Sequence, residues 1–235
     1  MLRFTLHFAL LVTVAGCQSG LDKTSPVTMS SAEYQSRPAA APSLFATDEA
    51  VLSGASIEQI LSSKVVIPKK ARLAVLQFGH RDAWRWWSED LSQLSQEVEA
   101  GSIARLQRSP RFSDVSLLPA LMVPEKKSVS YLREAAARYQ ADLLLVYQTN
   151  GRVYNRPRFI GPDEVKARQV VEAILLDVRT GIVPFASTSP QEFTAKKAKD
   201  DFNFSETIAK AELKAVGLGL AKIADDLARF LEAVP

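Results

Sequence analysis

Cys17 is the only cysteine of the 235 residues, so it is the one thiol that the chain can use for chemistry. It has no partner for an internal disulfide. Of the two histidines, His7 lies in an apolar leader and only His80 lies further along the chain. A Cys/His nucleophilic site and a zinc site rich in His or Cys both need more such residues than the chain supplies. We therefore expect no metal and no cofactor.

The carboxyl and hydroxyl groups give no stronger sign of catalysis. His80 stands two residues before Asp82, which could orient it, but no serine has the sequence context of an activated nucleophile. The acidic pairs at 163–164 and 200–201 are adjacent, so their side chains point apart on regular structure, as solvated loop acids do. No glycine-rich loop could cradle a phosphate. The sequence predicts that the protein is not an enzyme.

All three tryptophans fall between residues 80 and 87, in the run His-Arg-Asp-Ala-Trp-Arg-Trp-Trp. The run follows the C-terminal end of a predicted strand, where ligands tend to bind in open α/β sheets. Tryptophan and arginine also dominate binding hot spots. In the alternative, two tryptophans close the core over the sheet edge and the arginines are solvated. The predicted surface, for a partner protein or a glycan strand, consists of Arg81, Trp84, Arg85, Trp86 and Trp87.

A second candidate surface lies between residues 150 and 163, which we expect to form a solvated loop because Arg, Asn, Pro and Gly are frequent there. Its basic and aromatic side chains could contact an anionic polymer or an acidic partner. The alternative is an ordinary hairpin tip without a binding role. The candidate residues are Arg152, Tyr154, Arg156 and Arg158.

The charge of the chain is nearly balanced, with 29 Lys and Arg against 26 Asp and Glu and a formal net charge of +3. Basic and acidic residues are interspersed, so the chain lacks the basic stripe that nucleic-acid binding requires. We expect no nucleic-acid partner.

Residues 1–16 are typical of a secretory signal peptide, with a basic start at Arg3 and an apolar stretch of about ten residues. That stretch is too short to span a bilayer as a helix. Val14-Ala15-Gly16-Cys17 resembles the lipobox of bacterial lipoproteins. The resemblance implies that Cys17 becomes the new N-terminus and carries a diacylglycerol thioether and an amide-linked acyl chain, which anchor it in the membrane. Gln18 after it, instead of Asp, implies the outer membrane. The alternative is an ordinary secretory leader.

Composition divides the rest of the chain into three parts. Residues 17–46 are rich in Ser, Thr, Ala, Pro and Gln and predict a flexible tether behind the lipidated cysteine, with a reach of roughly 30 Å. Residues 47–68 predict a short helix that begins in a capping box at Ser56 and packs on the edge of the domain. Residues 69–235 predict one periplasmic α/β domain.

Hydrophobic periodicity in this domain predicts the order βαβαβββα, an α/β sandwich with a mixed sheet. Ser88 and Ser128 are expected to begin the first two helices, and Gly101 to kink or break the first. Asp177 is expected to form the turn between two hairpin strands. The expected strands are 73–78, 112–118, 141–147, 169–178 and 182–188, and the expected last helix is 204–233.

Three short motifs resemble a group of envelope domains that includes the curli secretion lipoprotein, the lipoprotein activators of penicillin-binding proteins and the N-terminal domain of the Tol-system propeller protein. They are Leu-Ala-Val-Leu-Gln-Phe at 73–78, Tyr-Gln-Ala-Asp-Leu-Leu-Leu at 139–145 and Leu-Asp-Val-Arg-Thr-Gly at 176–181. Gln77 departs from the group, whose members often have proline there. A curli-type pore also needs membrane-crossing hairpins, and residues 150–163 suit a solvated loop instead.

The expected anchor and this resemblance together imply a non-catalytic lipoprotein on the periplasmic face of the outer membrane. It would bind another envelope protein, as a regulator of peptidoglycan synthesis or as an accessory to secretion or appendage assembly. Two alternatives stay open. One is an oligomeric curli-type secretion component, which would make the chain a homo-oligomer, and the other is a peptidoglycan-binding protein.

Overall fold

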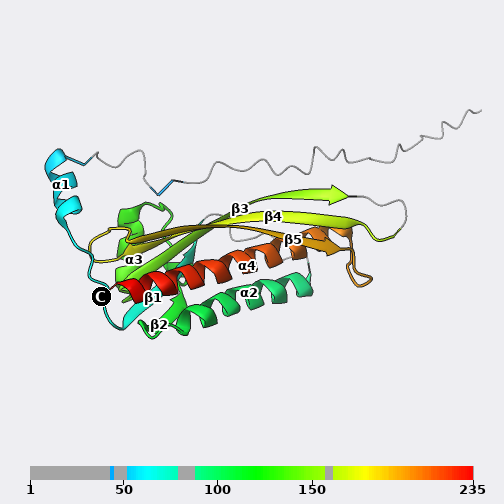
Figure 1. The fold of residues 1–235 in the computed structure, drawn as a ribbon, viewed down its shortest axis with the longest axis horizontal. Coiled ribbons are helices and arrows are strands. Elements are labelled where there is room, and N and C mark those ends of the chain that lie inside the picture. The colour runs from blue at the N-terminus through cyan, green and yellow to red at the C-terminus, as the bar shows by residue number, and fades with distance from the viewer. Residues whose placement is uncertain (1–42, 45–51, 79–87, 157–160, 235) are drawn as a thin grey trace, which may run out of the picture.

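Five strands form one mixed sheet in the order β2-β1-β3-β4-β5 (Figure 1). The computed structural model describes residues 43–44, 52–78, 88–156 and 161–234. β1 pairs in parallel with β2 and β3, and β3, β4 and β5 pair antiparallel. The strands are β1 (Ala71–Gln77), β2 (Phe112–Leu117), β3 (Leu143–Arg156), β4 (Glu164–Asp177) and β5 (Phe185–Lys196). The helices are α1 (Gly54–Ser62), α2 (Glu89–Gln107), α3 (Val129–Arg138) and α4 (Phe204–Ala233), with a short 3₁₀ turn η2 (Ala120–Met122). From β1 onward the order is βαβαβββα, which confirms the predicted fold class.

Three of the helices begin at an N-cap residue whose side chain accepts a hydrogen bond from a free backbone N–H group of the first turn. The Ser88 hydroxyl accepts a hydrogen bond from the Leu91 amide at 3.1 Å, as predicted, and begins α2. Asn203 does the same for α4 by accepting from the Glu206 amide at 3.0 Å. The prediction for α1 is wrong in detail, because Ser53 caps this helix by accepting from the Ser56 amide at 3.1 Å.

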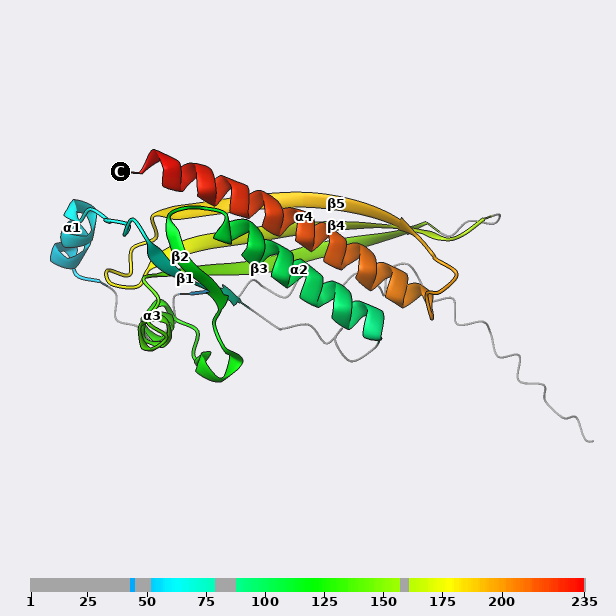
Figure 2. The same ribbon diagram turned by 90° about the horizontal axis from the view of Figure 1, so that it is seen from below.

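The two faces of the sheet are covered to different extents. α2 and α4 lie side by side along one face (Figure 2), where α4 contributes Leu220, Ile223, Leu227 and Leu231 to the larger apolar cluster. The other face carries α3 and Met122 of η2, which pack against side chains of β1, β3 and β4. Successive side chains of a strand point to opposite faces of the sheet. Alternate residues therefore lie in a thick core beneath α2 and α4, and the residues between them lie in a thinner core on the side of α3.

β3, β4 and β5 continue together beyond the end of β1, and we call this extension the arm (residues 148–156, 164–172 and 188–196) (Figure 1). β1 ends its pairing with β3 at Tyr147, whereas β3 and β4 stay in register as far as Arg156 and Glu164. The expected loop at 150–163 is therefore wrong in its first half, because residues 150–156 belong to β3. α4 has 30 residues, about 45 Å, and matches 14-residue strands of about 48 Å, so it supports the arm along its length.

Two further expectations fail against the structure. α1 does not pack on the edge of the domain, since none of its residues is buried. α2 runs without interruption through Gly101, and a Cβ at this position would meet nothing within 4 Å. Within the described residues no helix combines the length and the apolar composition needed to cross a bilayer.

Gly219 is required where α4 crosses β4, and Gly101 is not required in α2. A Cβ at Gly219 would lie 2.4 Å from Cγ2 of Val171, a branched side chain that cannot turn away. Gly219→Ala is expected to lower the free energy of unfolding by about 1–3 kcal/mol because α4 or Val171 must shift. Gly101→Ala, the matched control, is expected to raise it by up to about 1 kcal/mol, since alanine favours a helix. Urea unfolding followed by circular dichroism measures the change in the free energy of unfolding for both variants. Changes of the same sign would contradict the close approach of α4 to β4.

Candidate partner-binding face

One face of the arm is turned away from α4, and we call it the outer face. Directly opposite residues on antiparallel strands share a face, so the register defines its rows. Ala167 and Val165 point toward α4 and are buried, whereas Lys166 and Arg168 between them are exposed. No helix within the described parts of the chain packs on this face of the arm. From the base to the tip, the rows are Gln148–Glu172–Thr188, Asn150–Val170–Pro190, Arg152–Arg168–Glu192 and Tyr154–Lys166–Thr194.

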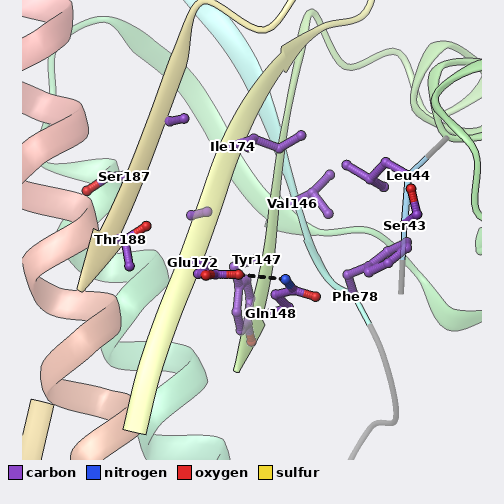
Figure 3. Close-up of a pocket in the computed structure, with 12 residues that line it drawn as sticks. Ser43, Leu44, Phe78, Val146, Tyr147, Gln148, Glu172, Ile174, Ser187 and Thr188 are labelled. Carbon is purple, nitrogen blue, oxygen red and sulfur yellow. Dashed lines mark hydrogen bonds between the residues drawn. The ribbon is translucent and has the colours of Figure 1, made fainter. Parts of the chain in front are cut away.

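A pocket of about 530 Å³ lies at the base of the outer face (Figure 3). Val146, Ile174 and Phe78 give it an apolar lining. On its polar side, the Gln148 side-chain amide donates to the Glu172 carboxylate at 2.7 Å. Leu44 also lines it, held by a hydrogen bond from the Val129 amide to the Leu44 carbonyl at 3.1 Å. The pocket thus continues the outer face toward α3.

A basic row crosses the middle of the outer face. Arg152 and Arg168 are directly opposite each other, an arrangement that destabilises a sheet unless an anion compensates it. Glu192 is the neighbouring anion, 4.0 Å from Arg168. It is already bound by Lys166 at 2.5 Å, and this hydrogen bond lowers the pKa of the Glu192 carboxyl. Arg152 forms no ion pair with any residue that the structure describes, so positive charge is left uncompensated.

The predicted site residues fall in three groups. Arg152 and Tyr154 lie on the outer face, on a strand instead of the expected loop, and Tyr154 is 52% exposed. Arg156 is the last residue of β3, opposite Glu164. The structure leaves the third group open. Cys17, Arg81, Trp84, Arg85, Trp86, Trp87 and Arg158 lie outside the described residues.

The sequence did not point to Lys166, Arg168 and Glu192, although Arg168 and Glu192 complete the basic row and Lys166 lies in the next row. The signal was the strict alternation of Glu-Val-Lys-Ala-Arg over residues 164–168, which is typical of a half-buried strand. The predicted strand begins only at Gln169, five residues later, and therefore leaves these residues out.

A second polar cluster, the Lys210 cluster, joins the beginnings of α2 and α4. It corrects the expectation that Asp201 is a solvated loop acid, because the Asp201 side chain is only 2% exposed. The Lys210 ammonium group lies 2.9 Å from Asp201, 3.0 Å from Asp90 and 3.2 Å from Glu206. The Ser88 hydroxyl donates to Glu206 at 2.9 Å and ties in the start of α2.

Each ionised group of the Lys210 cluster has hydrogen-bond partners, and three carboxylates share the one ammonium group. Burial alone would raise the pKa of Asp201, but hydrogen bonds from Thr207, Lys210 and the Ala198 amide together lower the pKa. Burial likewise opposes the ionised forms of Glu206 and Lys210, yet their bonds lower the pKa of Glu206 and raise the pKa of Lys210. All three groups are therefore ionised at neutral pH, and their role is to hold the two helices together.

The motif residues shared with the envelope domains also have structural roles. Asp177 accepts hydrogen bonds from the Arg179 and Thr180 amides, which confirms it as a turn-former, and Gly181 follows with φ +78°. Asp142 accepts from the Arg72 amide at 3.0 Å and from the Arg179 guanidinium at 3.0 Å. These motifs determine how the strands are joined. In the described part of the chain, no group of three His, Cys, Asp or Glu residues could hold a metal ion.

No protein-family model matches the chain, and no curated protein matches it. Solved structures share parts of the fold at low identity. A candidate lipoprotein from Caulobacter crescentus is 16% identical, with a TM-score of 0.39 over 68% of this chain and 90% of that chain. The PelC dodecamer from Paraburkholderia phytofirmans is 13% identical, with a TM-score of 0.30 over 68% and 93%. The LpoB C-terminal domain from Salmonella enterica is 13% identical, with a TM-score of 0.33 over 57% and 90%.

Proposed function

We propose that the chain is a non-catalytic lipoprotein of the bacterial cell envelope, anchored through Cys17, whose α/β domain binds another envelope protein. The leader and the four residues ending in Cys17 support the anchor and the envelope location. The observation that carries the binding role is the outer face of the arm, with the opposed Arg152–Arg168 pair and the exposed Tyr154 ring beside it.

The chemistry of this face favours an acidic protein surface as the partner. A guanidinium group binds a carboxylate through two parallel hydrogen bonds, so a partner surface with an acidic side chain for each of Arg152 and Arg168 would compensate both charges. A tyrosine ring adds contact area at little cost in conformational entropy. The strands that carry these groups are held from behind by α4, so little ordering is needed on binding.

The lipid anchor would strengthen such a contact by keeping the domain near its partner. A flexible segment between the lipid and the domain keeps the arm at a high local concentration near a partner in the same envelope compartment. A regulator of peptidoglycan synthesis and an accessory to secretion or appendage assembly would both work in this way. We place the protein on the periplasmic face of the outer membrane because Gln18 follows Cys17.

A homo-oligomeric secretion component is the second candidate, favoured by β5. This strand has 12 residues and pairs on one side only, with β4, within the described sheet. An unpaired strand edge is a template for another chain. Pro190 in the middle of the strand opposes such pairing, because proline donates no backbone hydrogen bond.

The test is crosslinking of the lipidated full chain in intact envelopes, followed by capture. Reversing the basic row with Arg152→Glu/Arg168→Glu is expected to lower recovery of one dominant partner about tenfold or more, as loss of a binding hot spot does. Arg108→Glu/Lys199→Glu, which reverses the same charge at exposed positions outside the arm, should leave recovery unchanged.

Other outcomes point elsewhere. A partner that is retained by the arm variant and lost only with Trp84→Ala/Trp87→Ala would move the contact to the tryptophan segment. Recovery of self-crosslinked rings alone would establish the oligomeric component. Capture of peptidoglycan in place of a protein would establish the wall-binding alternative.

A further inference from the structure

α1 presents an apolar surface that no described part of the domain buries. Ile57, Ile60 and Leu61 are spaced i, i+3 and i+4, so they share one side of the helix. They are 46%, 43% and 75% exposed. Leu52 before the helix is 54% exposed and Val66 after it is 81% exposed. Large apolar side chains gathered at one place on a surface mark a contact with something apolar.

The polar residues around α1 indicate the charge of that contact. The flank that follows α1 is basic, with Lys64, Lys69 and Lys70 before β1, whereas the acidic residues nearby are Glu58 in the helix and Asp48 and Glu49 ahead of Leu52. An amphipathic helix with a basic flank is the pattern that binds the surface of an anionic bilayer. Its apolar side enters the acyl boundary and its lysines meet the phosphates.

The position of α1 in the chain brings a membrane within its reach. About 35 residues separate it from Cys17, a span of roughly 30–35 Å for a flexible chain. A helix of nine residues binds a bilayer weakly on its own. An anchor at this distance raises its effective concentration at the surface to about the millimolar range, at which weak binding suffices.

We propose that α1, with Leu52 and Val66, lies on the anionic phospholipid surface of the membrane that holds Cys17. The inference rests on the proposed lipid anchor for the distance between them, whereas the affinity of α1 for lipid depends on its own residues. Figure 1 shows the consequence, because α1 lies at one end of the long axis and the tip of the arm at the other. Docking of α1 therefore places the tip of the arm at the end of the molecule that lies away from the bilayer.

The test uses the full chain, because acylated Cys17 leaves a single introduced cysteine as the only free thiol. Ile60→Cys is labelled with an environment-sensitive dye, and the protein is reconstituted in vesicles of phosphatidylglycerol and phosphatidylcholine containing a spin-labelled quencher lipid. Gln59→Cys is the matched control, because it is the neighbouring residue on the opposite side of the helix. Quenching at position 60 is expected to exceed quenching at position 59 about threefold or more.

Charge and lipid composition give the second comparison. Pure phosphatidylcholine vesicles, and the Lys69→Glu/Lys70→Glu change, are each expected to reduce the quenching at position 60 to the level of position 59. Equal quenching at both positions in anionic vesicles would overturn the proposal. Failure of the anchor is read separately, because the dye would then label the unsubstituted chain at Cys17. The signal of that chain is subtracted from both variants before positions 59 and 60 are compared.

Discussion

Lys210→Met is expected to lower the free energy of unfolding by about 3–5 kcal/mol, because it leaves buried carboxylates without their cation. The side chains of Asp201 and Glu206 are 2% and 7% exposed, and both contact the Lys210 ammonium group. Methionine fills a similar volume, so the loss comes from charge and not from a cavity. Urea unfolding at pH 7 measures the change.

Lys222→Met is the matched control, in the same helix. Lys222 also pairs with an aspartate one turn away, Asp226, but its side chain is 49% exposed. A solvent-exposed pair of this kind contributes about 1 kcal/mol or less. Equal losses for Lys210→Met and Lys222→Met would contradict the burial of the Lys210 cluster.

The free energy of unfolding should change with pH in opposite directions in the unsubstituted chain and in the Lys210→Met variant. In the unsubstituted chain the pKa values of Asp201 and Glu206 are lowered, so their contribution is present above the ordinary carboxyl range and is lost as the pH falls below about 4. Without Lys210, burial is expected to raise both pKa values above the unfolded ones, so protonation favours the folded state. The stability gap between the two proteins should therefore narrow as the pH falls from 7 toward 4.5.

Leu227→Ala is expected to lower the free energy of unfolding by about 2–5 kcal/mol. Leu227 is fully buried where α4 packs on the sheet, so its truncation leaves a cavity that the strands cannot close. The measurement is urea unfolding followed by circular dichroism. α4 also supports the arm. Molecules that this substitution unfolds are therefore expected not to capture the partner.

Leu218→Ala makes the same chemical change in the same helix, at a side chain that is 48% exposed. Its expected effect is about 0.5 kcal/mol or less, as for other surface substitutions. A loss comparable to that of Leu227→Ala would mean that α4 is covered on its outer side as well, by a second copy or by a partner.

The anchor, α1 and the outer face of the arm form a consistent arrangement under these proposals. Lipid and α1 hold one end of the molecule at the membrane, and the arm carries the binding residues to the other end (Figure 1). The Lys210 cluster lies where α2 and α4 begin, so it stabilises the helix that supports the arm. Different substitutions therefore test the lipid anchor, the orientation of the domain at the membrane and the binding of the partner.

The elements that the sequence determined by itself are those with a local signal. The last helix was predicted at 204–233 and is found at Phe204–Ala233, because its apolar side chains repeat with the helical period over its whole length. Asp177 was recognised as a turn-former because its carboxylate bonds to backbone amides two and three residues later. Both signals lie within a few neighbouring residues.

The tertiary structure decided what depends on residues far apart in the sequence. Whether Arg152 stands on a loop or on a strand depends on Arg168 opposite it, and whether Arg168 is compensated depends on Glu192 on the next strand. Asp201 is buried only because Lys210 and Thr207 come to it from α4. α1 is exposed because no apolar surface in the described part of the domain covers it. Strand pairing, burial and charge compensation join distant parts of a chain, so no local pattern specifies them.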